Sequence, residues 1–431
     1  MNKKLLSIAC VASLAISASA ASDPGITELW KTPNIEELKG AWSAATDWSN
    51  PSAIKATSNP RFATAKDGKV YTINMKTMAI AEVTLEGLKD LYVLPNIDPD
   101  FYGTAISIDE AGNFLVGEDF VSVESAQKWT IYSPSTGQSK RFDIGVPEGW
   151  TLGRVDCVGR VLGDLTREAL FFLAPNNDGT SKVRVMKATG NGTVNSVELT
   201  ELDGVSVSQQ VSGYPQNIVQ PGFNTYAEYE AAGEDNYNFY YSACCSTSQI
   251  YTAYLDGKTT TSFAPDLTLS INAPINGFTT FTLEGKRYFV RSYSLNKTFD
   301  MAIAVTDANG DILTTWINND WSPNGGYSSI IAEPVDDKTA YIYVYNSGNN
   351  YGAAAQLVFD PAQCGAPIVP EKPVGLTPDA PYMISTPAQF IEMASKISTA
   401  DFYVALENDL DFEGIEFTPV SSKSRSFSRA T

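Results

Sequence analysis

Between residues 60 and 360 the chain alternates short β-branched and aromatic runs with turns of Gly, Asp and Asn. Such runs, bounded by turn residues, predict β-strands that are joined in hairpins. In the clearest case, strands over 62–65 and 69–73 flank Lys66-Asp67-Gly68. Asp-Gly there supplies the positive φ angles that a two-residue hairpin turn requires. No amphipathic stretch in the span reaches the roughly 10–12 residues of a helix, so the span is predicted to be all-β.

Hairpin turns recur along this whole span. Further turns are predicted at 135–137, 177–179, 256–257, 284–285 and 336–338. Those near residues 256, 284, 309 and 337 lie roughly 26 residues apart, and two hairpins per four-stranded blade then give a repeat of about 50 residues, near kelch length. The pattern predicts a β-propeller of about seven blades, with tandem β-sandwiches as the alternative.

Two segments share one detailed pattern. Residues 106–115 (ISIDEAGNFL) and 304–313 (AVTDANGDIL) each place a D-x-x-G-(N/D) turn between two apolar strands. This pattern resembles the hairpins of secreted β-propellers, including the NHL and SMP-30-like groups. The resemblance implies the propeller architecture and carries no catalytic residue to this chain.

After the β-rich body the composition and the periodicity both change. Residues 364–380 contain four prolines in a polar stretch, which predicts a semi-rigid linker. Thr386 then precedes Pro387 and Gln389, the arrangement of a capping box with proline at the first helical position. Apolar residues follow at the spacing of one helix face, at Phe390, Met393, Ala394 and Ile397. Residues 402–406 then alternate between apolar and other side chains as a strand does.

The order of these C-terminal elements, PYMISTPAQFIEMASKIS followed by YVALENDLDF and FTPV, resembles the opening of adhesin-type right-handed β-helices. The resemblance implies a capping helix and then stacked strands. A polar, serine-rich tail follows where further rungs would stand, so residues 381–431 are interpreted as a truncated β-helix cap. The alternative is a short tail that packs on the main body.

The N-terminus predicts export. Lys3 and Lys4 precede an apolar run over 5–16 and the small residues Ala18-Ser19-Ala20, the pattern of a cleaved secretory signal peptide. A lipoprotein anchored at Cys10 is the alternative. The predicted organisation is therefore a signal peptide over 1–20, a propeller-like domain over 21–363, the linker over 364–380 and the truncated segment over 381–431. The mature protein is expected in the periplasm, at the cell surface or outside the cell.

Charge and composition exclude several function classes. The chain has no histidine, which removes Ser-His-Asp and Cys-His catalysis and every imidazole-based metal site. Its formal net charge of −19 disfavours nucleic-acid partners. No stretch approaches the length of a transmembrane helix. The composition does not predict the oligomeric state.

Cysteines and acidic motifs offer little chemistry. Four cysteines remain after the predicted cleavage, and they allow three disulfide pairings. They are Cys157, Cys244, Cys245 and Cys364. We expect buried thiols or one long-range disulfide. The motifs Asp98-x-Asp100 and Asp307-x-Asn309-x-Asp311 resemble fragments of calcium loops but lack the downstream acid, so they are interpreted as turns. No metal site, cofactor or catalytic residue is assigned.

Binding is therefore the preferred hypothesis. The loop 318–327 is polar and glycine-rich and carries two rings that we expect to be exposed, and ring closure would bring early tryptophans near it. The candidate ligand-binding residues are Trp42, Trp48, Trp316, Asp320, Trp321, Asn324 and Tyr327. Flat rings stack on the apolar faces of sugars, so we expect a secreted, non-enzymatic binding or adhesion module for a glycan or cell-surface partner. The alternatives are that these tryptophans fill the spaces between blades, and that paired carboxylates run a histidine-free glycoside hydrolase or lyase.

Overall fold

The fold was analysed in a computed structural model. It describes residues 24–33, 63–74, 79–94, 105–117, 126–145, 158–173, 181–207, 218–232, 238–242, 250–254, 259–263, 274–294, 301–318, 320–321, 327–348, 351–365, 382–396, 404–407 and 409–412. By its internal contacts the chain divides into two units, and the main boundary falls after Ile368, inside the predicted linker. Among the described residues, no helix is long and apolar enough to cross a membrane.

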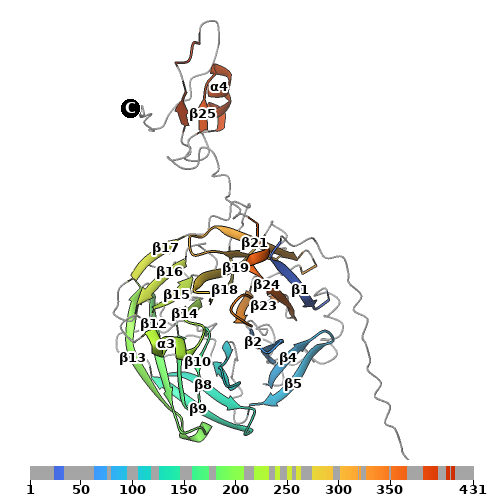
Figure 1. Ribbon diagram of the computed structural model, residues 1–431, viewed down its shortest axis with the longest axis vertical. Coiled ribbons are helices and arrows are strands. Elements are labelled where there is room, and N and C mark those ends of the chain that lie inside the picture. The colour runs from blue at the N-terminus through green and yellow to red at the C-terminus, as the bar shows by residue number, and fades with distance from the viewer. Residues whose placement is uncertain are drawn as a thin grey trace, which may run out of the picture. The chain divides into compact units, whose positions relative to one another are not determined.

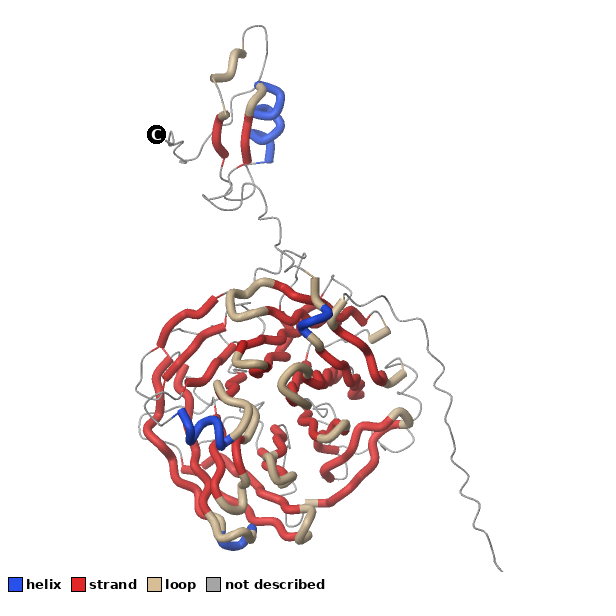
Figure 2. The backbone as a smooth tube through the Cα atoms, in the orientation of Figure 1, coloured by secondary structure: helices blue, strands red, loops and turns tan. Residues whose placement is uncertain are grey.

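Within the described residues, the first unit contains six antiparallel sheets of four strands each. The sheets are arranged around a common axis (Figures 1 and 2). Five of them consist of four strands consecutive in the chain, and the sixth combines three consecutive strands with the N-terminal strand. This arrangement is a β-propeller, which confirms the predicted all-β fold class. The first four blades have the following strands.
Blade 1 contains β2 (Ala63–Lys66), β3 (Lys69–Asn74), β4 (Ala79–Thr84) and β5 (Gly87–Val93). Blade 2 contains β6 (Ala105–Ile108), β7 (Phe114–Gly117), β8 (Ala126–Ser133) and β9 (Gln138–Gly145). Blade 3 contains β10 (Leu162–Gly163), β11 (Glu168–Leu173), β12 (Ser181–Thr189) and β13 (Glu198–Val207). Blade 4 contains β14 (Ile218–Pro221), β15 (Asn238–Ser242), β16 (Ile250–Tyr254) and β17 (Thr259–Phe263).

The last two blades and the short helices complete the unit. Blade 5 contains β18 (Pro274–Leu283), β19 (Lys286–Ser294), β20 (Met301–Thr306) and β21 (Ile312–Asn318). Blade 6 contains β22 (Tyr327–Pro334), β23 (Ala340–Gly348), β24 (Tyr351–Phe359) and the N-terminal β1 (Ile26–Lys31). Helix α3 (Tyr226–Ala232) lies between β14 and β15, and the short helices η1 (Val194–Ser196) and η3 (Pro361–Gln363) lie outside the sheets.

The described sheets number six, against the expectation of about seven blades. The estimate assumed a repeat of about 50 residues throughout. The innermost strands of blades 2 to 6 begin at Ala105, Leu162, Ile218, Pro274 and Tyr327, so successive blades there begin more than 50 residues apart. The additional residues lie in the connections, whose lengths the hairpin turns do not reveal.

The ring closes through the N-terminus. Strand β1 pairs antiparallel with β24, so blade 6 combines the first strand of the chain with three strands from the end of the domain. Thr32 N–H donates to the carbonyl of Ala354, whose own N–H donates to Thr32 Oγ1. Closure therefore ties the two ends of the domain together by main-chain hydrogen bonds.

The predicted hairpin turns are confirmed wherever the structure describes them. Asp67 and Gly68 have φ angles of 51° and 81°, and Glu284 and Gly285 have 47° and 73°. These paired positive values are those of the two-residue turn that joins twisted antiparallel strands. The turns at 135–137 and 336–338 join β8 to β9 and β22 to β23. The turns expected at 177–179 and 256–257 lie outside the described residues.

The shared D-x-x-G pattern marks one kind of turn, in two different places. Asp109 and Asp307 each donate their N–H four residues ahead, to Asn113 and Asp311, and each accepts the N–H of the glycine three residues ahead. The first turn joins the inner strands β6 and β7 of blade 2, while the second joins the outer strands β20 and β21 of blade 5. The repeat is therefore local and does not correspond to one blade position.

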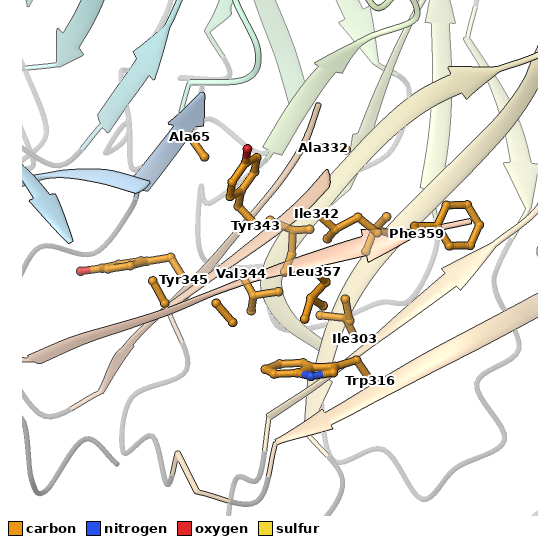
Figure 3. Close-up of a cluster of buried hydrophobic side chains, with 14 of the residues drawn as sticks. Ala65, Ile303, Trp316, Ala332, Ile342, Tyr343, Val344, Tyr345, Leu357 and Phe359 are labelled. Carbon is orange, nitrogen blue, oxygen red and sulfur yellow. The ribbon is translucent and has the colours of Figure 1, made fainter. Parts of the chain in front are cut away.

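Apolar side chains pack between neighbouring blades. The largest buried cluster joins residues of blades 5, 6 and 1, including Ile303, Val344 and Leu357 (Figure 3). A second cluster joins blades 2 and 3 around Trp129 and Phe171, whose ring centroids are 6.4 Å apart. The propeller is thus held together by sheet-to-sheet packing, which leaves the axis to the innermost strands.

The second unit is small. Strands β25 (Tyr382–Ile384) and β26 (Val404–Leu406) pair in parallel, with helix α4 (Pro387–Lys396) between them in sequence. The predicted capping box is present: Gln389 N–H donates to Thr386 Oγ1 at 3.3 Å, and Thr386 N–H donates to Gln389 Oε1 at 3.1 Å. The predicted helix start and the following strand are confirmed, and the β-helix interpretation stays a prediction.

Candidate functional site

A cavity of about 250 Å³ lies at the axis of the propeller. All six blades contribute to its wall, through inner strands and the segments that flank them. The lining residues are 63–66, 106–110, 158–161, Gln220, Asn224, Thr225, Phe278, Thr279 and 328–334. These residues lie toward the ends of the inner strands that carry the first hairpin turn of each blade. Because no single blade forms this site, it exists only in the closed ring.

Side-chain hydrogen bonds join neighbouring inner strands around the cavity. Ser107 Oγ donates to Gly159 O at 3.0 Å, which joins blades 2 and 3. Gln220 accepts from Arg160 N–H and donates to Phe278 O, both at 3.1 Å, and so bridges blades 3, 4 and 5. Ser328 and Ser329 accept the N–H groups of Gly277 and Ala63, both at 2.9 Å, and join blade 6 to blades 5 and 1. These hydrogen bonds therefore link all six blades around the cavity, although apolar side chains such as Ile108 and Val158 also line it.

Arg160 extends from blade 3 to the three following blades. Its guanidinium donates to the carbonyl oxygens of Ala332 at 2.8 Å, Thr280 at 3.1 Å and Phe223 at 3.5 Å. Although part of the residue is exposed to the cavity, its guanidinium lies deep in the protein, and this burial lowers the pKa of Arg160 to about 10. The cation thus joins four blades through neutral acceptors.

Two acidic residues of the wall connect the turns of different blades. Glu110 Oε1 accepts the N–H groups of Gly163 at 2.8 Å and Tyr226 at 2.7 Å, which joins blade 2 to blades 3 and 4. Glu333 accepts Asp67 N–H at 3.1 Å and the Tyr343 hydroxyl at 2.8 Å, which joins blade 6 to blade 1. Both carboxylates therefore hold the ring closed.

Asp109 is the most deeply buried acid of the wall. It is 2% exposed and accepts Asn113 N–H and Leu165 N–H, each at 2.7 Å, and Asn113 Nδ2 at 2.9 Å. Burial raises the pKa of Asp109 to about 6, although these hydrogen bonds oppose the shift and nearby Asp164 adds to it. The D-x-x-G pattern predicts a turn at Asp109, whereas the position of this residue in the cavity wall follows from the tertiary structure.

Lys66 brings a second positive charge to the wall. It ends β2, directly before the Asp67-Gly68 turn, and is partly exposed. In the described part of the chain its ammonium group has no ion-pair partner. Lys69 is its cross-strand partner and does not line the cavity. The Nζ atom of Lys69 lies 3.5 Å from Oε2 of Glu82, which forms an ion pair. The two lysines of one turn therefore have different surroundings.

Two of the four tryptophans predicted to bind a ligand, Trp316 and Trp321, are core residues. Trp316 and Trp321 are 1% and 0% exposed, and their ring centroids are 5.8 Å apart. Trp316 lies beside Ile303 and Val344 (Figure 3) and donates to Glu28, while Trp321 donates to Thr32 O. The expectation that Trp321 presents an exposed ring is therefore wrong, because both indoles fill the junction with the N-terminal strand. A ligand role for them stays a prediction that their burial disfavours.

The remaining predicted site residues divide into two groups. Asp320 is exposed and pairs with Lys31 at 2.7 Å, next to β1. Trp42, Trp48 and Asn324 lie outside the described residues, and of Tyr327 only the backbone is described.

Cys364 is a free thiol, and burial raises its pKa to about 11. The other three cysteines lie outside the described residues, so no disulfide prediction is tested.

The sequence contained one weak signal for the cavity. Arg160 interrupts the apolar run Val158-Gly159-Arg160-Val161-Leu162, and a lone arginine in a buried strand usually has a specific partner.

Asp307, by contrast, is a turn residue as predicted, since it accepts the N–H groups of Asn309 and Asp311 at 2.8 and 2.9 Å. Among the described residues, no group of three or more acids and cysteines is placed to hold a metal ion.

Comparisons with known proteins identify no relatives by sequence. No family model and no curated protein matches the chain. A protein of unknown function from Dyadobacter fermentans is similar in structure over 78% of this chain and 100% of its own, with 10% identity and a TM-score of 0.45. The haemagglutinin-neuraminidase ectodomain of parainfluenza virus 5 is similar over 78% of this chain and 85% of its own, with 9% identity and a TM-score of 0.43. The Trypanosoma rangeli sialidase is similar over 70% of this chain and 54% of its own, with 11% identity and a TM-score of 0.41. Likenesses this distant carry no argument about function.

Proposed function

We propose that this chain is a non-enzymatic binding module that takes a glycan group into the axial cavity. The observation that carries the proposal is the composition of the wall. It has spare N–H donors on Lys66 and Arg160, and the carboxylates of Glu110 and Glu333 lie in the same wall, where each also accepts N–H groups of neighbouring blades. A sugar hydroxyl both donates and accepts, so a frame of fixed donors and acceptors suits a hydroxyl-rich ligand. Among the described residues of the wall, Phe278 is the only aromatic one, so the proposal rests on polar contacts and not on ring stacking.

The roles of the acidic residues favour binding over catalysis. A general acid or base must exchange a proton with the ligand. Asp109, Glu110 and Glu333 instead use their oxygens to hold N–H groups of neighbouring blades. Proton transfer at these groups would weaken the junctions that form the cavity.

Catalysis remains the second candidate because of one observation. Burial raises the pKa of Asp109, which lines the cavity, to about 6, a value suited to a general acid near neutral pH. A histidine-free glycoside hydrolase or lyase would pair it with a second carboxylate.

The setting proposed for this binding is outside the cytoplasm. Support comes from the basic, apolar and small-residue pattern over 1–20, which predicts export. The partner would then be a free glycan or a glycan on a cell surface.

A glycan array probed with the full chain tests the proposal. Ile108→Trp should abolish the signal by filling the cavity, because Ile108 is a partly exposed residue of its wall. Ile317→Trp is the matched control, since Ile317 is also partly exposed but lies on outer strand β21, away from the cavity. Equal binding by both variants would place the glycan elsewhere and refute the proposal.

The same array hits separate binding from catalysis. Each bound glycan is incubated with the full chain, and products are followed by mass spectrometry. Unchanged glycans are the expected result. Cleavage that is lost in Asp109→Asn would establish the enzyme instead.

A further inference from the structure

Two guanidinium groups meet at a single residue beside the cavity. Arg160 Nη2 donates to Thr280 O at 3.1 Å, and Arg287 Nη1 donates to Thr280 Oγ1 at 3.4 Å. Arg287 also donates to Gly222 O and lies over the Tyr240 ring, 5.3 Å from its centroid. Burial lowers the pKa values of both arginines, and for Arg160 the neighbouring Arg287 charge contributes. Two like charges therefore lie close together in a region removed from water.

Another buried arginine of the same protein has the partner that these two lack. Arg184 is 2% exposed, and its guanidinium holds Glu201 with two hydrogen bonds of 2.9 and 2.6 Å. Buried charges are normally paired in this manner. Among the described residues, neither Arg160 nor Arg287 has an ion pair. Arg160 is also the one that lines the cavity.

The nearby acids do not supply the missing partner. Glu110, Glu228 and Glu333 are close enough to raise the pKa of Arg160 slightly. Each, however, accepts main-chain N–H groups: those of Gly163 and Tyr226, of Asn224, and of Asp67, respectively. Three of the five N–H donors of Arg160 are engaged, which leaves Nε and one hydrogen on Nη1 without an acceptor in the described structure. The wall thus has spare cationic donors on Arg160 and Lys66.

We infer that the group which enters the cavity is a carboxylate, bound by Arg160 and Lys66, so that the ligand is an acidic saccharide of the uronic acid class. The inference rests on the proposed glycan-binding function and specifies its ligand. A carboxylate has two oxygens, so it can accept one charge-assisted hydrogen bond from a spare N–H of Arg160 and another from Lys66. The acids around the cavity would repel a dianion such as a phosphate monoester more strongly than a carboxylate. The volume of about 250 Å³, below the roughly 300–1,000 Å³ of drug-sized pockets, suits one sugar residue.

Galacturonate and galactose are the matched probes, because they differ only in the carboxylate at C6. Calorimetric titration of the full chain should show galacturonate binding at least about tenfold more tightly than galactose. Added salt should weaken the binding of galacturonate and leave the binding of galactose unchanged. Lys66→Gln should reduce the affinity for galacturonate roughly tenfold, and Lys69→Gln, on the other side of the same turn, should leave it unchanged.

Arg160→Lys tests the second donor, with the melting temperature as a check on folding. If this variant does not fold, the Lys66 and Lys69 pair still decides the outcome. Equal affinity for both sugars, or equal effects of the two lysine variants, would overturn the inference while leaving glycan binding intact. If acetate and galacturonate bind equally and require Lys66, the carboxylate site stands but its source is a free carboxylate, and the glycan function fails. Tighter binding of inorganic phosphate than of galacturonate would overturn the carboxylate assignment.

Discussion

The indole N–H of Trp30 donates a hydrogen bond of 2.6 Å to Oε1 of Gln356, although 326 residues separate them. Trp30 lies on β1 and Gln356 on β24, where the two residues are direct register partners. The register shifts between Glu28 and Trp30, as expected for a bulge. This contact therefore fixes the register of the strand that closes the ring.

Trp30→Phe should weaken this closure. The substitution leaves Oε1 of Gln356, a residue 5% exposed, without its donor, and an unsatisfied buried acceptor costs about 1–3 kcal/mol. We expect the free energy of unfolding, measured with denaturant, to fall by that amount. Leu29→Ala is the control: Leu29 is 42% exposed and should change stability by less than about 0.5 kcal/mol. Equal losses in the two variants would mean that the indole hydrogen bond contributes nothing.

Asp109 should give the protein an unusual dependence on pH. The pKa of this carboxyl rises from 3.8 when unfolded to about 6 in the fold, so the native state binds the proton more tightly. Its contribution is complete below pH 3.8 and is lost as the pH rises through about 6. Between pH 5 and 7, wild type should lose on the order of 1–2 kcal/mol relative to Asp109→Asn.

Denaturant titrations of both proteins at the two pH values provide the measurement. Asp109→Asn also disturbs the hydrogen bonds with Asn113 and Leu165, so its absolute stability will differ from wild type. The difference between the two pH values isolates the titration. If the two proteins respond identically to pH, Asp109 titrates in the fold as it does in the unfolded chain.

Two glycines with similar backbone angles should differ in their tolerance of alanine. Gly112 and Gly163 have φ angles of +88° and +92°. A Cβ at Gly112 meets no atom within 4 Å, while one at Gly163 would lie 2.2 Å from Glu168 O. Gly112→Ala should cost about 1 kcal/mol through backbone strain alone. Gly163→Ala should cost clearly more and lower the melting temperature further, whereas equal costs would show that the backbone at 163 relaxes freely.

The C-terminal unit should respond to mutation independently of the propeller. Thr386→Ala removes the hydroxyl that caps α4, which costs about 0.5–2 kcal/mol of helix stability. Hydrogen exchange should accelerate over Pro387–Lys396 and stay unchanged in the blades. Deletion of residues 379–431 should likewise leave the melting of the propeller unchanged. A drop of more than about 4 °C would contradict the division into two units.

The candidate site was less predictable than the fold. The polar, glycine-rich loop 318–327 predicts a surface position for Trp321, with Trp316 close to it in the chain. Their position in the chain gave no sign that β1 would cover them. Glu110 and Asp109 looked like ordinary turn residues, and Arg160 like an isolated charge in an apolar run. Their roles follow from contacts with other blades, and the only local sign of such contacts is the arginine that interrupts the apolar run 158–162.

Local chemistry therefore determined the elements of this protein. Asp67-Gly68 specifies a hairpin, because Asp and Gly adopt positive φ angles more cheaply than most residues. Gly285 contributes to the turn at 284–285 in the same way, and Thr386 with Gln389 specifies the start of α4. Only the tertiary structure decided how the described strands divide into sheets and that β1 joins blade 6. It also decided that a site forms at the axis. The physical reason is that hairpin formation depends on neighbouring residues, whereas the cavity arises where six inner strands, distant in sequence, meet in one closed ring.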